Sequence, residues 1–309
     1  MVADVREGGE WSVAQRCKND VIYATTRSAL ACASRLPLSS LPGLGRALGA
    51  AAWWLWIGRR QALRNVAATL PALGEAARRS LVRATYRQLG ARLGETVGML
   101  RGGCAPLFMS EESVQVLAEA RADGRGVVLA SAHLGPWERV AATLATACPL
   151  TVVGREAYDA RLTRVLEAVR QRAGVRCIYR GAPGAGAAML RVLKRGEILG
   201  IPMDFRSRVP SVMAPFLGRL APTAVGPARI ALRRRARVVV ATAAPMPVDA
   251  ADGGADVLGA VTVEHVDTSG LAADDAGELE LTTRINARLS RRILDAPDAW
   301  PWMHPRWQE

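Results

Sequence analysis

The hydrophobic pattern changes character near residue 102, where two kinds of segment begin to alternate. Short apolar runs are typical of strands buried in a sheet, and they occur at 127–130, 150–153, 175–179, 198–201, 238–243 and 257–266, with 212–216 as a further candidate. Apolar residues at helical spacing fill the segments between them, at 136–147, 160–172, 187–194, 224–235 and 278–294. This alternation predicts an α/β fold with a mixed, mostly parallel sheet flanked by helices. A Gly-, Ala- and Asp-rich stretch at 249–256 is expected to be a surface loop.

The first hundred residues have a helical character instead. Apolar side chains recur at approximately helical spacing through residues 75–100, and Gly102-Gly103 then breaks the pattern. We therefore expect an N-terminal helical, membrane-associating region at 1–101 and an α/β domain at 102–309, which together form one functional unit.

Residues 36–58 raise the question of a membrane segment. Two prolines and an arginine interrupt this apolar region, and its uninterrupted part, 47–58, is shorter than the roughly 20 residues that a spanning helix needs. Residues 53–60 read Trp-Trp-Leu-Trp-Ile-Gly-Arg-Arg, a composition that suits the interface between bilayer and water. The alternative is a helix packed on the protein core with its tryptophans buried. The sequence leaves open whether the segment spans the membrane or lies on it.

Charge and cysteine content narrow the class of protein. Lys and Arg together number 41 against 28 acidic residues, giving a formal net charge of +13. Such an excess points to an anionic partner, namely membrane lipid, a phosphorylated substrate, an acidic protein or nucleic acid. The alternative is that the excess of arginine reflects only the base composition of the genome. The five cysteines are scattered without a Cys-x-x-Cys pair, which favours a reducing compartment and argues against structural zinc.

The segment Ser-Ala-His-Leu-Gly-Pro-Trp-Glu at 131–138 follows the first predicted strand of the α/β domain. Gly135 and Pro136 signal a turn and a helix start, which places His133 before the helix and Glu138 in its first turn. We expect the carboxylate to accept the proton on Nδ1 of the imidazole and to leave Nε2 as a base for a hydroxyl. The alternative is a histidine bonded to a backbone carbonyl, beside a glutamate that only complements the helix dipole.

Asp204 and Arg155 are candidates because both follow predicted strands, and the carboxyl ends of such strands collect the chemistry of α/β proteins. Asp204 is also a possible N-cap for the next element. Arg170 ends a predicted helix, where it would either clamp an anionic group or complement the helix dipole. The apolar run 212–223 contains Gly218-Arg219 and could wall a site for an acyl chain, or it could be a plain core strand.

Together these residues resemble the lysophospholipid acyltransferase superfamily and, within it, the lipid A late acyltransferase family, over about residues 53–307. The marker of the family is a His-x4-Asp/Glu motif, which is present here as His133 to Glu138. Pro136 stands at a position where the family pattern has Asn. The further matching segments are Arg60–Pro71, Arg170–Gly174, Gly200–Asp204, Pro215–Gly218 and Trp300–Trp307.

The resemblance implies an acyltransferase in which His133 deprotonates an acceptor hydroxyl and Glu138 orients the imidazole. Arg170 or backbone N–H groups would hold the oxyanion, and Arg155, Arg170, Asp204, Gly218 and Arg219 are the expected substrate-binding residues. The donor would be an acyl carrier protein or coenzyme A thioester, with no metal or redox cofactor. The acceptor would be a lipid A precursor or related glycolipid at the cytoplasmic face of the inner membrane.

Two alternatives remain at this stage. The same chemistry could serve a lysophospholipid, a mannosylated lipid or an aminolipid. A basic peripheral membrane or nucleic-acid binding protein on an inactive fold is the second alternative, and the intact His133 and Glu138 argue against it.

Overall fold

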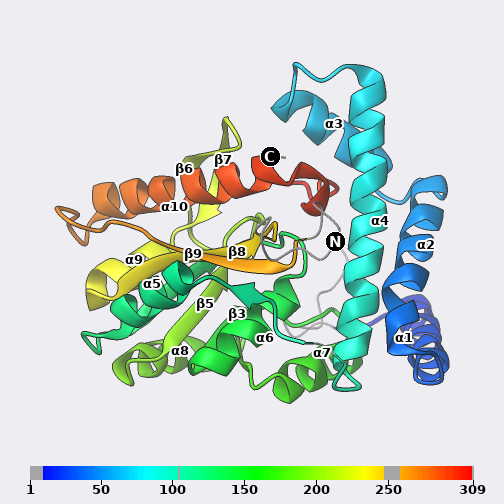
Figure 1. Cartoon of the computed structure of the whole chain (residues 1–309), viewed down its shortest axis with the longest axis horizontal. Helices are drawn as coiled ribbons and strands as arrows, with labels where there is room; N and C mark the ends of the chain where they lie inside the picture. The colour runs from blue at the N-terminus through cyan, green and yellow to red at the C-terminus, as the bar shows by residue number, and fades with distance from the viewer. Residues whose placement is uncertain (1–9, 104, 247–257, 308–309) are drawn as a thin grey trace.

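A computed structural model of the chain describes residues 10–103, 105–246 and 258–307, so the predicted loop at 249–256 lies outside the described residues. Its centre is a seven-stranded sheet in the order β1-β9-β8-β2-β5-β3-β4 (Figure 1). The strands are β1 (Phe108–Met109), β2 (Val127–Ser131), β3 (Leu150–Gly154), β4 (Arg176–Tyr179), β5 (Ile198–Pro202), β8 (Arg237–Ala244) and β9 (Ala260–His265). Among the described strands of this sheet, only β8 and β9 pair in antiparallel fashion, so the predicted mixed, mostly parallel sheet is confirmed.

Helices flank this sheet. Figure 1 shows α10 above the sheet and both α6 and α8 below it. The helices of this part of the chain are α5 (Glu111–Arg121), α6 (Trp137–Ala147), α7 (Ala160–Arg172), α8 (Ala185–Lys194), α9 (Gly226–Arg234) and α10 (Asp275–Asp295). The hydrophobic pattern predicted all of these helices except α5. The apolar residues of α5 show only weak helical periodicity.

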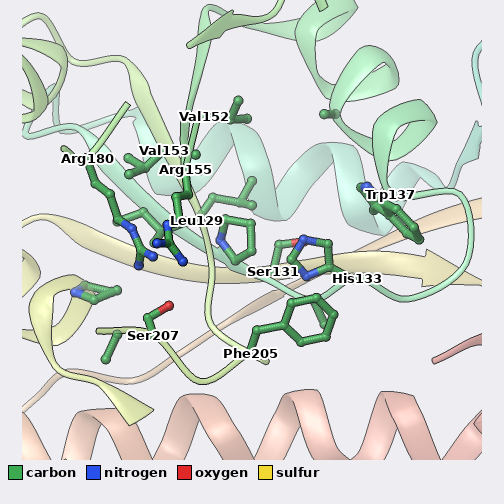
Figure 2. A pocket seen from close by; sticks show the side chains of 18 of the residues that line it. Leu129, Ser131, His133, Trp137, Val152, Val153, Arg155, Arg180, Phe205 and Ser207 are labelled. Atoms are coloured by element: carbon green, nitrogen blue, oxygen red, sulfur yellow. The ribbon is translucent and has the colours of Figure 1, made fainter. Parts of the chain in front are cut away.

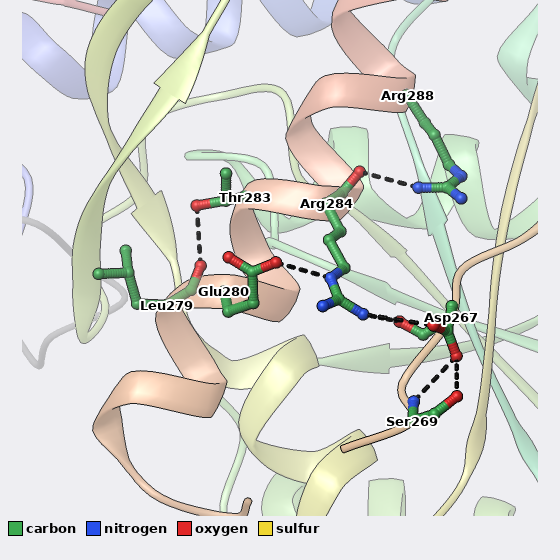
Figure 3. A network of polar contacts seen from close by, with 7 residues as sticks. All are labelled: Asp267, Ser269, Leu279, Glu280, Thr283, Arg284 and Arg288. Carbon is green, nitrogen blue, oxygen red and sulfur yellow. Dashed lines mark hydrogen bonds and ion pairs between the residues drawn. The ribbon is translucent and has the colours of Figure 1, made fainter. Parts of the chain in front are cut away.

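Helix α10 is fixed to the end of β9 through arginine side chains (Figure 3). The Arg284 guanidinium donates to the backbone carbonyl of Asp267 at 3.0 Å and pairs with Glu280 one turn earlier at 2.7 Å. One turn further along, Arg288 donates to the carbonyl of Arg284, and Arg291 pairs with Glu264 of β9 at 2.6 Å. The helix therefore uses part of the arginine excess for internal contacts.

The predicted strand at 212–216 forms, but in a separate hairpin of β6 (Ser211–Phe216) and β7 (Arg219–Ala224). Phe216 pairs with Arg219, which leaves Leu217 and Gly218 as the two turn residues, with φ of +51° and +76°. Positive φ at both positions is typical of a type I′ hairpin turn, where glycine is favoured. Sequence patterning missed β7 because Pro222 and Thr223 interrupt its apolar alternation.

The N-terminal region consists of helices α1 (Val13–Ala33), α2 (Leu41–Trp54), α3 (Arg59–Thr69) and α4 (Glu75–Met99). The backbones of α2 and α4 approach each other closely where Gly45 faces Gly90. A Cβ atom on either glycine would clash with the backbone carbonyl of the other. The long helix α4 also contacts the short 3₁₀ helix at Pro297–Ala299, which follows α10. Helix α4 therefore connects the N-terminal region to the α/β domain (Figure 1).

The three tryptophans near the end of α2 do not share one environment. Trp53 is buried against Tyr86 of α4, as the core-packing alternative predicted, whereas Trp54 and Trp56 are 64% and 59% exposed. Within the described ranges, every helix is too short or too polar to cross a bilayer.

Candidate active site

The site lies where neighbouring parallel strands end. Strand β2 pairs with β5 in register from Val127 with Ile198 to Ser131 with Pro202, and the amide of Met203 continues this pairing to the carbonyl of Ser131 at 2.9 Å. His133 and Asp204 each follow their strand by two residues, so the sheet brings them face to face.

A buried carboxylate orients the imidazole. Nδ1 of His133 lies 2.9 Å from Oδ1 of Asp204, and the backbone N–H of His133 donates to Oδ2 at 2.9 Å. The indole N–H of Trp300 donates to the same Oδ2 at 2.9 Å. Asp204 is fully buried, while the side chain of His133 is 27% exposed and lines a cavity.

These contacts determine the protonation of the pair. Burial alone would raise the pKa of Asp204, but the charge and hydrogen bonds of His133 and the indole of Trp300 bring that pKa below its ordinary value. An ionised carboxylate only accepts, so Nδ1 carries the proton and Nε2 is the basic atom. Burial would lower the pKa of His133, yet Asp204 outweighs it and raises that pKa above 6.5.

Asp204, and not Glu138 as expected, is the carboxylate that contacts Nδ1 of His133, and its side chain is fully buried. The left-handed turn at Gly135, with φ of +58°, carries the chain away before helix α6 begins. Glu138 instead pairs with Arg170 of α7, whose Nη2 and Nε lie 2.6 and 3.0 Å from its two oxygens. This bidentate pair holds Glu138 and Arg170 beside the site, where both charges act on the pKa of His133.

The imidazole of His133 is the first of three stacked rings. Phe205 lies between two imidazoles, with ring centroids 4.2 Å from His133 and 4.1 Å from His304 and nearly parallel planes. Trp137 meets His133 edge-on at 5.4 Å. Burial lowers the pKa of His304 to about 4, so this second imidazole is neutral at physiological pH. The stack restricts rotation of the base about its side-chain bonds.

The cavity beside His133 has a volume of about 810 Å³ and is walled by β2, β3, β5, α4 and α6. Its apolar wall includes Leu129, Val140, Leu144, Leu150, Val152 and Met189. Figure 2 shows His133, Trp137 and Phe205 at one part of this cavity and Arg155 and Arg180 at another. The volume and the apolar lining suit a small-molecule or lipid chain rather than a flat protein surface.

Not every predicted substrate residue reaches this cavity. Arg155 and Arg170 line it, but Gly218 and Arg219 do not. Gly218 serves the β6–β7 turn, and the Arg219 guanidinium lies 4.8 Å from the ring centre of Trp307. Residues 212–223, which were expected to line an acyl-chain site, do not line this cavity. Residues of the parallel strands β2, β3 and β5 line it instead.

Sequence reasoning missed Phe205, Arg180, Trp300 and His304 as site residues. The C-terminal segment carried a signal for the last two, since it matched the expected family pattern. Among the residues that the structure describes, no group of three or more His, Cys, Asp or Glu side chains is placed to hold a metal ion.

Comparison with known proteins decides the family. The model of the bacterial lipid A biosynthesis acyltransferase family matches residues 26–309. The chain belongs to this family. A search of curated proteins finds no individual match. Family membership implies acyltransferase activity with an acyl donor and a lipid acceptor, which confirms the enzyme class expected from the sequence.

Two segments that carried the family resemblance meet in space. Asn65 of α3 is buried, and its side-chain amide donates to the carbonyls of Trp302 at 2.7 Å and His304 at 2.8 Å. The C-terminal segment of this acyltransferase thus contacts the site at two places. Trp300 donates a hydrogen bond to Asp204, and the ring of His304 stacks on Phe205.

The carboxylate that orients His133 can be identified by exchanging each candidate for its amide. Asp204→Asn should lower the maximal rate of acyl transfer by about 100- to 10,000-fold, because the basic tautomer of His133 is lost. It should also move the acidic limb of the kcat/KM profile to lower pH, since the negative charge that raises the pKa of His133 is removed. Glu138→Gln removes the same charge, so it serves as the matched comparison and should move this limb less. A larger shift in Glu138→Gln would contradict the assignment of Asp204.

Proposed function

We propose that this acyltransferase moves a fatty acyl group from a thioester to a hydroxyl of a lipid A precursor or a related glycolipid. The observation that carries the proposal is the His133–Asp204 pair at the edge of a largely apolar cavity of about 810 Å³. A base with a free Nε2 can activate an alcohol, and an apolar cavity can hold the chain to be transferred. Each buried CH₂ contributes about 0.8 kcal/mol, so the chain supplies much of the binding energy.

In this mechanism Nε2 of His133 takes the proton of the acceptor hydroxyl while its oxygen attacks the thioester carbonyl. The tetrahedral intermediate then collapses by breaking the carbon–sulfur bond, and the imidazolium returns the proton to the departing thiolate. Asp204 keeps the imidazole in the required tautomer and stabilises the imidazolium. Glu138 adds negative charge nearby, while Arg170 holds Glu138 in place.

The donor in this proposal is an acyl carrier protein or coenzyme A thioester, and no metal or redox cofactor takes part. The match to the bacterial lipid A biosynthesis acyltransferase family supports this choice of acceptor. A lysophospholipid, a mannosylated lipid or an aminolipid as acceptor would use the same base and cavity, so the product must be identified chemically.

Turnover and product can be tested together with the full chain in detergent micelles. His133→Ala should reduce acyl transfer to a phosphorylated glucosamine-disaccharide lipid by at least about 100-fold, because the general base is lost. Thioester consumption and the mass of the lipid product would be followed, with a lysophospholipid as competing acceptor. His265→Ala is the matched control, because His265 lies on β9 with a 42% exposed side chain and outside the cavity. Near wild-type transfer by His133→Ala would refute the assigned base, and preferred acylation of the lysophospholipid would refute the acceptor.

We further propose that the enzyme lies on the cytoplasmic face of the inner membrane through its N-terminal region. The end of α2 and the turn that follows it present four exposed apolar residues, each between 59% and 71% exposed, namely Trp54, Leu55, Trp56 and Ile57. Cations accompany them, since the Arg59 guanidinium lies 4.0 Å from the ring centre of Trp56 and that of Arg83 lies 5.8 Å from Trp54. Exposed indoles beside arginines suit the headgroup layer of an anionic bilayer.

Removing the two exposed indoles should release the protein from lipid. The Trp54→Ser/Trp56→Ser variant should bind anionic vesicles at least about 10-fold more weakly than the wild type in a sedimentation assay, because indole burial in the interface is lost. Val114→Ser/Leu279→Ser removes exposed apolar side chains from α5 and α10 and should leave binding unchanged. Equal binding by all three proteins would place the membrane contact elsewhere.

A further inference from the structure

The β6–β7 hairpin is attached to the α/β domain by one of its two faces. Phe216 and Thr223 are fully buried on this inward face, and Thr223 accepts hydrogen bonds from Asn286 of α10 at 3.1 Å and from Arg306 at 2.7 Å. Figure 1 shows the tip of the hairpin projecting beyond α10, away from the seven-stranded sheet. The opposite face of the hairpin is therefore available for a partner.

This outward face is apolar. The strand register places Met213 opposite Pro222 and Pro215 opposite Leu220, and the side chains of Met213 and Leu220 are 56% and 63% exposed. Because side chains alternate along a strand, six uncharged residues share the outward face, namely Ser211, Met213, Pro215, Leu220, Pro222 and Ala224. The solvated face of an antiparallel sheet is ordinarily polar, so an apolar one indicates an interaction surface.

Two prolines make the hairpin a poor partner for an added protein strand. Phe216 and Arg219 close the two-residue turn, so the next pair along the ladder contains Pro215 and the pair two further on contains Pro222. At these alternate pairs the backbone nitrogens point away from the hairpin. Proline has no N–H to donate there, so it blocks strand addition and leaves no unpaired amide at that position in an apolar medium.

The charge of this part of the chain suits an anionic surface. Residues 205–224, which comprise the hairpin and the loop before it, contain three arginines and no carboxylate. Arg208 is exposed shortly before β6, and Arg219 lies beside the turn at the tip. Cations next to exposed apolar side chains are typical of surfaces that bind the headgroup layer of an anionic membrane.

The outward face also extends to the cavity beside His133. Pro210, just before β6, lines that cavity, and so does Ala224 at the end of β7. Ala224 belongs to both surfaces, so the alternate residues Leu220, Pro222 and Ala224 form an apolar row from the hairpin tip to the cavity. Lipid in contact with the outward face would therefore lie next to the substrate space.

We propose that the outward face of the β6–β7 hairpin is a second lipid-binding surface, which rests on an anionic bilayer and holds the cavity against it. The inference rests on the proposed function in one respect, since a lipid substrate gives the contact its purpose. It goes beyond the N-terminal contact at Trp54 and Trp56, because the hairpin belongs to the α/β domain. Two separate contacts fix the orientation of a protein on a membrane, whereas a single turn leaves it free to tilt.

Vesicle binding without substrate tests this surface. Met213→Ser/Leu220→Ser should bind vesicles of equal parts phosphatidylglycerol and phosphatidylcholine about 5- to 20-fold more weakly than the wild type, because two apolar side chains no longer insert. Adding Trp54→Ser/Trp56→Ser should weaken binding beyond either pair alone, since two linked contacts reinforce each other.

Exposed apolar residues on the other side of the sheet provide the control. Figure 1 shows α8 below the sheet and α10 above it. Val114→Ser/Leu190→Ser removes two exposed apolar side chains from α5 and α8, and it should bind these vesicles as the wild type does.

A local probe reports the contact directly. A nitrobenzoxadiazole label on Leu220→Cys, in a chain whose exposed Cys17 and Cys32 are replaced by serine, should gain fluorescence at least about twofold on the same vesicles, because the dye leaves water. The label on Leu190→Cys should not respond. The parent chain without an added cysteine gives the signal from the remaining thiols.

Unchanged vesicle binding by Met213→Ser/Leu220→Ser, together with an unresponsive label at position 220, would overturn the proposed surface. A label that responds to protein concentration in the absence of vesicles would also overturn it, because a second copy of the chain would then cover this face. Neither measurement contains a substrate, so this surface and the proposed acyl transfer fail separately.

Discussion

The active site depends on one buried interaction, the hydrogen bond between Nδ1 of His133 and the carboxylate of Asp204. An ionised carboxylate inside a protein costs several kcal/mol unless its oxygens are well satisfied. Asp204 meets this requirement by accepting bonds from the imidazole, from the backbone of His133 and from the indole of Trp300. Because 71 and 96 residues separate Asp204 from His133 and Trp300 along the chain, the Nδ1-protonated tautomer of His133 is held only when the sheet and the C-terminal segment are both in place.

The same sheet edge distributes the remaining tasks in space. His133 follows strand β2, its carboxylate partner Asp204 follows β5, and Arg155 and Arg180, which follow β3 and β4, line the same cavity. Between them lies the apolar cavity for the acyl chain. A reactive centre and a long apolar chain can therefore be held at separate places along one edge, which fits an acyltransferase of the lipid A biosynthesis family.

The fold and the position of His133 at the sheet edge could be predicted from sequence, but the carboxylate that contacts its imidazole could not. Buried parallel strands are apolar throughout, so their positions show in the pattern, and a histidine directly after such a strand lies at the functional edge. The choice between Glu138 and Asp204 depended on the turn at Gly135 and on the neighbours of β2, which no local spacing reveals. Gly218 and Arg219 were misplaced for a similar reason, since an apolar run does not show whether it joins the main sheet or a hairpin.

The state of His133 can be measured directly by ¹⁵N nuclear magnetic resonance. The chain contains three histidines, so a ¹⁵N-histidine-labelled sample gives few ring signals, and His133→Ala assigns those of the base. Our account predicts a titration midpoint above 6.5 that falls in Asp204→Asn, and at pH values above this midpoint a neutral His133 that carries its proton on Nδ1. A proton on Nε2, or a midpoint that Asp204→Asn leaves unchanged, would contradict the central role of this pair.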